Sequence, residues 1–162
     1  MKTLLPLLLL PLLSACAVGH AGPRNHREFL VTVDEASLSD QDVLAVTTAV
    51  FEWQSFGVPL TMVLGSCSGD GVPGGNICVR GETLAEIVAD TGNGATLDYT
   101  AAVYGAVCEL NPGASVAQAA HEIGHGMGLI HTGTGTVMCA FVGCDAPGVT
   151  AADKQQWDDT RE

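Results

Sequence analysis

The segment from His121 to His131 holds three histidines and one glutamate at spacings that suit metal chemistry. His121 and His125 are four residues apart, so on a helix both imidazoles project from the same side. Neutral imidazole suits Zn²⁺, and a catalytic zinc usually takes three protein ligands and keeps one position for water. Glu122, next to the first histidine, is placed to act as general base on that water. The predicted chemistry is attack of an activated water on a carbonyl group, without a protein nucleophile.

The residues after His125 predict how a third ligand reaches the same metal. Gly128 can take the left-handed conformation that ends a helix and turns the chain sharply. His131 follows three residues later and can come back beneath the metal as the third ligand. Gly124 and Gly126 weaken the helix by roughly 1 kcal/mol each relative to alanine. We therefore expect tertiary packing to hold this helix.

The pattern His-Glu-x-x-His-x-x-Gly-x-x-His, followed by Met138, resembles the metzincin signature of zinc metallopeptidases. The short chain is most similar to matrixin-like bacterial members. This resemblance implies one catalytic zinc and an α/β (α+β) zincin fold, with a mixed twisted sheet, two long helices and a small C-terminal subdomain. A protein or peptide substrate would lie extended in a cleft between the subdomains, paired with an edge strand. Met138 would form the hydrophobic floor under the histidines.

Two positions depart from patterns in the wider family. Thr132 stands where the matrixin-like group often has serine, and Ala140 stands where astacin-like and serralysin-like members carry a tyrosine. We therefore expect no tyrosine ligand from this turn. A matrixin-type cysteine-switch prosegment is not found in the sequence, so latency by that route is not expected.

Two other classes of protein fit the same residues. One is a catalytically silent zinc-binding envelope lipoprotein, which the presence of Glu122 disfavours. The other is an envelope structural protein whose histidines bind nothing. A digest with and without chelator separates the first class from an enzyme, and metal analysis separates the second.

The N-terminal residues predict export and a lipid anchor. A single lysine precedes an apolar run over residues 4–13, which is too short to span a bilayer as an ordinary helix. The run ends in Leu-Ser-Ala-Cys16, which resembles the bacterial lipobox. We expect residues 1–15 to be a lipoprotein signal peptide and Cys16 to be acylated. The alternative is a plain secretory signal cut near Ala15 or Ala17.

We therefore expect the protein to be located in the bacterial cell envelope, at the outer membrane or the cell surface. Residues 16–28 have no apolar period and are predicted to be a tether, so His20 and His26 are expected to be exposed and not ligands. The chain has 18 acidic against 6 basic residues, a formal net charge of −12. Nucleic acid is therefore not expected as a partner. We expect a monomer.

The acidity fits the solubility of an exported protein better than calcium binding. A calcium site nevertheless has one candidate, Asp70 in the glycine-rich loop over residues 65–76. Export also permits disulfides. If Cys16 is acylated, five cysteines remain, and nearest-neighbour pairing leaves Cys108 free. The most economical pairs are Cys67 with Cys78 and Cys139 with Cys144.

Capping patterns and apolar periodicity predict the elements that position the ligands. Ser39, Ser115 and Thr150 each open a helix. The first helix extends to Gly57 with Trp53 in the core, the second ends at Gly128, and the third covers residues 152–159 with Trp157 packed on the core. Strands are predicted at residues 29–33, 59–64, 77–80, 95–99 and 102–108. One catalytic domain over residues 29–162 follows, with its N-terminal subdomain ending at about residue 128 and its C-terminal subdomain over residues 129–162.

Overall fold

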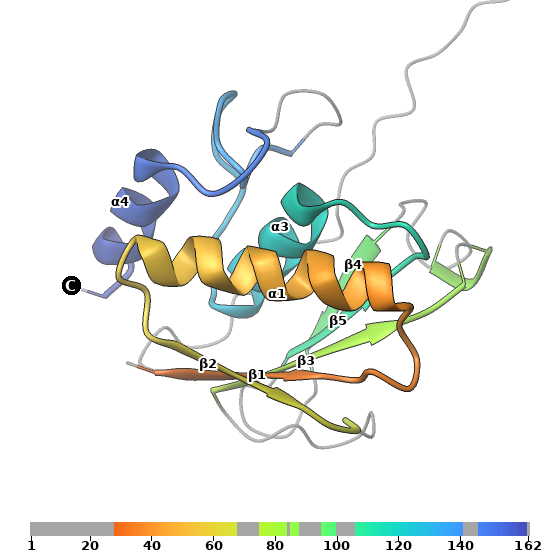
Figure 1. The fold of residues 1–162 in the computed structure, drawn as a ribbon. Helices are drawn as coiled ribbons and strands as arrows, with labels where there is room; N and C mark the ends of the chain where they lie inside the picture. The colour runs from red at the N-terminus through yellow and green to blue at the C-terminus, as the bar shows by residue number, and fades with distance from the viewer. Residues whose placement is uncertain are drawn as a thin grey trace, which may run out of the picture.

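The structure is a computed structural model that describes residues 28–67, 75–83, 85–87, 95–99, 106–140 and 146–161. Figure 1 shows a sheet with helices packed against it. The strands are β1 (Phe29–Val33), β2 (Leu60–Leu64), β3 (Asn76–Gly81), β4 (Ala95–Tyr99) and β5 (Ala106–Leu110). The helices are α1 (Asp40–Ser55), α3 (Val116–Gly126) and α4 (Ala151–Asp159). This mixed α/β architecture confirms the coarse part of the predicted fold class, a mixed sheet with helices.

The five strands form one mixed sheet in the order β2-β1-β3-β5-β4. The pairs β1–β2, β1–β3 and β3–β5 are parallel, and β4 pairs antiparallel with β5. The two edges of the described sheet are therefore β2 and β4. Of these two edges, β4 lies against α3 and β2 lies against α1.

One face of the sheet is covered by α1 and α3, which lie side by side (Figure 1). Strand side chains alternate between the two faces, so every second residue faces these helices. On β1 and β3 these are Val31, Val33, Ile77 and Val79, all fully buried. The helices add Val46, Val50, Trp53 and Ile123 to the same hydrophobic core. Because α3 is packed on both α1 and the sheet, its orientation is fixed.

The other face of the sheet carries a disulfide and an ion pair. Cys67 and Cys78 are bonded, as predicted, and pack on Val107. Arg80 on β3 donates to Glu109 on β5, with Nε 3.1 Å from Oε1. This pairing explains why Glu109, an acidic residue of β5, is buried.

The last strand differs from its prediction. We predicted a strand over residues 102–108, whereas β5 is Ala106–Leu110, and residues 100–105 lie outside the described part of the chain. β5 thus extends two residues past the predicted end and includes the charged Glu109. The cross-strand partner Arg80, which neutralises Glu109, is 29 residues away in the chain and has no local signature.

The start of α1 is tied to the turn before α3 by a buried carboxylate. The Ser39 side chain caps α1 by accepting the backbone N–H of Asp42. Asp42 in turn accepts the backbone N–H of Gly113 at 2.8 Å and the hydroxyl of Ser39 at 2.6 Å. The N-terminal end of α1 is thereby held against the turn that precedes α3.

The C-terminal helix α4 packs against the start of β1. Trp157 is buried, and its ring lies edge-on to Phe29 with the ring centroids 5.7 Å apart. The predicted core position of Trp157 is therefore confirmed. Among the helices that the structure describes, none is long and apolar enough to cross a membrane.

Candidate metal centre

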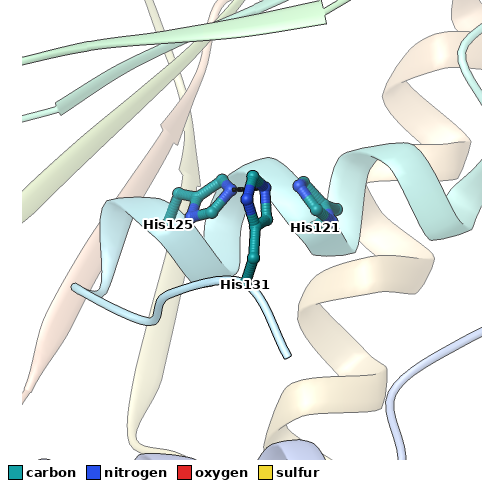
Figure 2. Close-up of side chains that lie close together, drawn as sticks. All are labelled: His121, His125 and His131. Atoms are coloured by element: carbon teal, nitrogen blue, oxygen red, sulfur yellow. Dashed lines mark hydrogen bonds between the residues drawn. The ribbon is translucent and has the colours of Figure 1, made fainter. Parts of the chain in front are cut away.

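Helix α3 and the turn that follows it bring three histidines together. His121 and His125 project from α3, and His131 comes from the segment after the helix (Figure 2). The helix ends at Gly126, and Gly128 has a φ of 91°, a left-handed conformation that favours glycine. The Gly128 N–H donates to the carbonyl of His125 at 2.7 Å. This turn returns His131 to the side of the helix that carries the other two imidazoles.

The three imidazoles have the dimensions of a metal site. One nitrogen from each ring lies within 4.8 Å of the others. The Nε2 atoms of His125 and His131 are 3.1 Å apart. Zinc binds imidazole nitrogen at about 2.0–2.1 Å, so two ligand nitrogens in a tetrahedron are separated by roughly 3.3 Å. The described residues therefore hold a cluster that can bind a metal ion.

Hydrogen bonds fix the tautomers of two of these histidines. Nδ1 of His121 lies 2.8 Å from the carbonyl oxygen of Val137, and Nδ1 of His125 lies 2.8 Å from that of Leu129. A carbonyl oxygen can only accept, so each Nδ1 carries a proton. The lone pair of each ring is then on Nε2. In His125 this lone pair is directed at Nε2 of His131, which suits a bound cation.

Burial lowers the pKa of two of the three histidines. Desolvation, followed by the nearby charge of His121, lowers the pKa of His125 to about 3, although the bond to the Leu129 carbonyl acts in the opposite direction. Desolvation and the charge of His121 also lower the pKa of His131. At neutral pH a metal ion does not have to displace protons from these two rings.

Glu122 lies inside the protein, directly after the first histidine. It is 2% exposed. Its backbone carbonyl accepts the thiol of Cys108, with sulfur and oxygen 3.5 Å apart. Cys108 is a free, buried thiol, and desolvation together with the charges of Glu122 and Glu109 raises its pKa well above the usual value.

Met138 packs against α3 from the turn after His131. It is fully buried, and the position of a Cβ on Gly124 would be 2.4 Å from its sulfur. The Met138 carbonyl accepts the backbone N–H of Thr132 at 2.9 Å. The turn that holds Met138 is therefore fastened to the segment that carries His131.

Asp153 is the residue at this centre that the sequence did not reveal. The predicted capping box with Thr150 is present. The same carboxylate also accepts the backbone N–H groups of Val137 at 3.1 Å and Met138 at 3.2 Å, and Asp153 is 0% exposed. One signal was available, because Asp153 lies four residues before Trp157 and so shares its buried helix face.

Most of the remaining predicted residues lie outside the described part of the chain. Cys139 is in a disulfide, and its predicted partner Cys144 lies outside the described residues. The predicted lipidation site Cys16 and the calcium candidate Asp70 also lie outside the described residues, as do the tether histidines.

Comparisons with known proteins add one likeness. No family model and no curated protein matches the sequence. Among solved structures, the chain is similar to the crystal structure of metalloproteinase-II from Bacteroides fragilis, with a TM-score of 0.49 and 14% sequence identity. The match covers 95% of this chain and 55% of that one, so the chain spans about half the length of that protein. At this level the likeness carries no argument about function, and the chemistry of the site rests on its own residues.

Proposed function

We propose that the protein is a zinc-dependent endopeptidase of the metzincin type. The observation that carries this proposal is the convergence of His121, His125 and His131, with carbonyl groups holding the Nδ1 protons of the first two. Three imidazoles without a carboxylate or thiolate form a set that suits zinc better than calcium or magnesium. One catalytic zinc is therefore the proposed cofactor.

Zinc bound by these histidines would supply a Lewis acid that lowers the pKa of a water molecule. Glu122 adjoins the first ligand, and its carboxylate is the base that takes a proton as the water attacks the scissile carbonyl. The same carboxylate then delivers this proton to the leaving amine nitrogen. Because Glu122 is 2% exposed, bulk solvent is kept away from this proton transfer.

The proposed substrate is an extended protein or peptide segment. In the described sheet, β4 is an edge strand, antiparallel to β5 and in contact with α3. An extended peptide that adds to such an edge gains main-chain hydrogen bonds. This placement would lay the peptide beside the helix that carries His121 and His125.

The test is digestion of a casein-derived peptide mixture, with zinc content measured on the same sample. We expect cleavage that a chelator stops and added zinc restores. Glu122→Gln should keep its zinc and lose turnover by about 10²–10⁴-fold, the usual contribution of a general base. Glu35→Gln, at an exposed carboxylate in the turn after β1, is the control and should cleave normally. Full activity of Glu122→Gln would refute the mechanism.

Two results would favour the other classes of protein. A zinc-loaded wild type that cleaves nothing would make a silent zinc-binding lipoprotein the better interpretation. Less than about a tenth of an equivalent of zinc after refolding with the metal would favour a structural protein, because a preformed three-histidine site binds zinc tightly.

We also propose that the protein is exported and anchored in the bacterial envelope through acylated Cys16. The support is the lipobox-like end of the apolar run, since residues 1–27 lie outside the described part of the structure. Cys16→Ala should move the protein from the membrane to the soluble fraction, and mass spectrometry of the N-terminal peptide should lose the acyl groups. An unmodified Cys16 in membrane-bound wild type would contradict the anchor.

A further inference from the structure

A single peptide group lies between Asp153 and His121. The carbonyl of Val137 accepts Nδ1–H of His121 at 2.8 Å. The N–H on the other side of that peptide bond belongs to Met138 and donates to Oδ1 of Asp153 at 3.2 Å. The second carboxylate oxygen, Oδ2, accepts the N–H of Val137 at 3.1 Å. A continuous hydrogen-bonded chain thus extends from a buried carboxylate to a metal-ligand imidazole.

We infer that Asp153 is a positioning residue for His121 and acts through the peptide group between Val137 and Met138. The inference rests on the proposed zinc site. A negative charge beside the N–H polarises the peptide, which makes its carbonyl a stronger acceptor. A stronger acceptor holds the Nδ1 proton and makes Nε2 a better metal ligand, as a carboxylate or carbonyl partner does for zinc-bound histidines in general. Here one peptide group is interposed between the carboxylate and the ring.

The burial of Asp153 agrees with such a role. Its side chain receives four donors, because the backbone N–H of Thr150 at 2.9 Å and the Thr150 hydroxyl at 2.6 Å join the two from the turn. Asp153 is 0% exposed. Four donors on one carboxylate fix both of its oxygens, so the orientation of the peptide at residues 137–138 is fixed with them.

A purely structural role for Asp153 is the competing explanation, and Asp42 provides a matched control for it. Asp42 is also buried, at 2% exposed, lies three residues after a helix N-cap and accepts the hydroxyl of that cap residue, Ser39. It also accepts a distant backbone N–H, that of Gly113. These bonds join Asp42 to Ser39 and Gly113, neither of which belongs to the metal centre. Replacing Asp42 by asparagine therefore shows how far zinc affinity falls when a buried carboxylate away from the metal centre is lost.

The experiment compares Asp153→Asn, Asp42→Asn and wild type in the full chain. Zinc affinity is measured by competition with a chromophoric chelator, and Co²⁺-substituted samples provide visible spectra. We expect Asp153→Asn to weaken zinc binding roughly 10-fold, within the range for partners of metal-bound histidines, and to shift the cobalt bands. Asp42→Asn should keep the wild-type affinity and spectrum. Equal affinities for wild type and Asp153→Asn, or equal losses in both variants, would overturn the inference.

A measurement on the wild type does not depend on whether Asp153→Asn folds. In the metal-free protein, ¹⁵N NMR should show His121 protonated on Nδ1, with the Met138 amide proton shifted downfield and slow to exchange. Protonation of His121 on Nε2, or a rapidly exchanging Met138 amide, would overturn the inference. Failure of the wild type to bind zinc would instead contradict the proposed function, so the two failures are distinguishable.

Discussion

Gly124 of α3 faces the sulfur of Met138 so closely that no side chain fits between them. A Cβ at position 124 would lie 2.4 Å from the Met138 sulfur and 3.2 Å from Cζ2 of Trp53. Both neighbours are fully buried. A glycine that weakens an isolated helix is thus required here, since it allows the turn that holds Met138 to approach α3 closely.

Gly124→Ala should therefore destabilise the protein, although alanine is the better helix former. Overpacking costs typically 1–3 kcal/mol, and the gain in helix propensity offsets up to about 1 kcal/mol of it. We expect a net loss of about 1–2 kcal/mol in urea unfolding, with weaker zinc binding because the turn moves. Gly133→Ala, where a Cβ meets nothing within 4 Å, is the control and should be neutral. A variant at position 124 as stable as wild type would contradict the packing argument.

His131→Ala should abolish tight metal binding without unfolding the protein. His131 is half-buried in the segment after α3, so removing its ring leaves the core intact. We expect zinc affinity to fall by more than about 100-fold, beyond the loss seen for partners of ligands. His26→Ala, in the predicted tether, should bind zinc like wild type. Zinc affinity of both variants is measured by calorimetric titration. Undiminished zinc binding by His131→Ala would show that His131 is not a ligand.

The thiol of Cys108 should resist alkylation until the protein unfolds. It is fully buried, and desolvation together with the charges of Glu122 and Glu109 raises its pKa, so almost no thiolate is present at neutral pH. Iodoacetamide should label it only in denaturant, as mass spectrometry of the Cys108 peptide would show. Labelling of the native protein at the rate of a small free thiol would show that this region opens readily.

Glu82 should make the stability of the metal-free protein fall as pH rises from about 4.5 to about 7. A side-chain hydrogen bond with Glu109, then burial and the charge of Glu109, raise its pKa from 4.5 to about 7, against the lowering effect of Arg80. The folded state therefore holds a proton that the unfolded state has released in this window. The stabilisation is complete below pH 4.5 and is lost as pH passes through 7.

The comparison that tests this pH dependence is Glu82→Gln against wild type in urea at pH 5 and pH 8. Other groups titrate in both proteins, so the difference between the two proteins isolates Glu82. We expect the variant to gain stability relative to wild type at pH 8 and to lose that advantage at pH 5. Glu35→Gln controls for the loss of one negative charge. A constant difference across the two pH values would exclude a raised pKa at Glu82.

Local patterns in the sequence predicted most of the fold elements because their causes are local. The caps at Ser39, Ser115 and Thr150 act over three residues, and the helices begin where these caps predicted. The spacing of His121 and His125 places two imidazoles on one helix side for the same reason. Five strands were predicted, and the last extends two residues beyond its predicted end, to Leu110, because Glu109 pairs with the distant Arg80.

Relationships between segments far apart in the chain required the tertiary structure. Asp153 could be predicted as a capping residue, but its bonds to Val137 and Met138 depend on how α4 docks against the turn. The indole N–H of Trp53 likewise donates to the carbonyl of Ala120 at 3.0 Å, across 67 residues. The sequence alone predicted the cluster of three histidines, because one short helix and the turn after it bring these residues together. The tautomer of His121 and the support of its ring were decided by tertiary packing, since the Val137 carbonyl and the Asp153 carboxylate come from other segments.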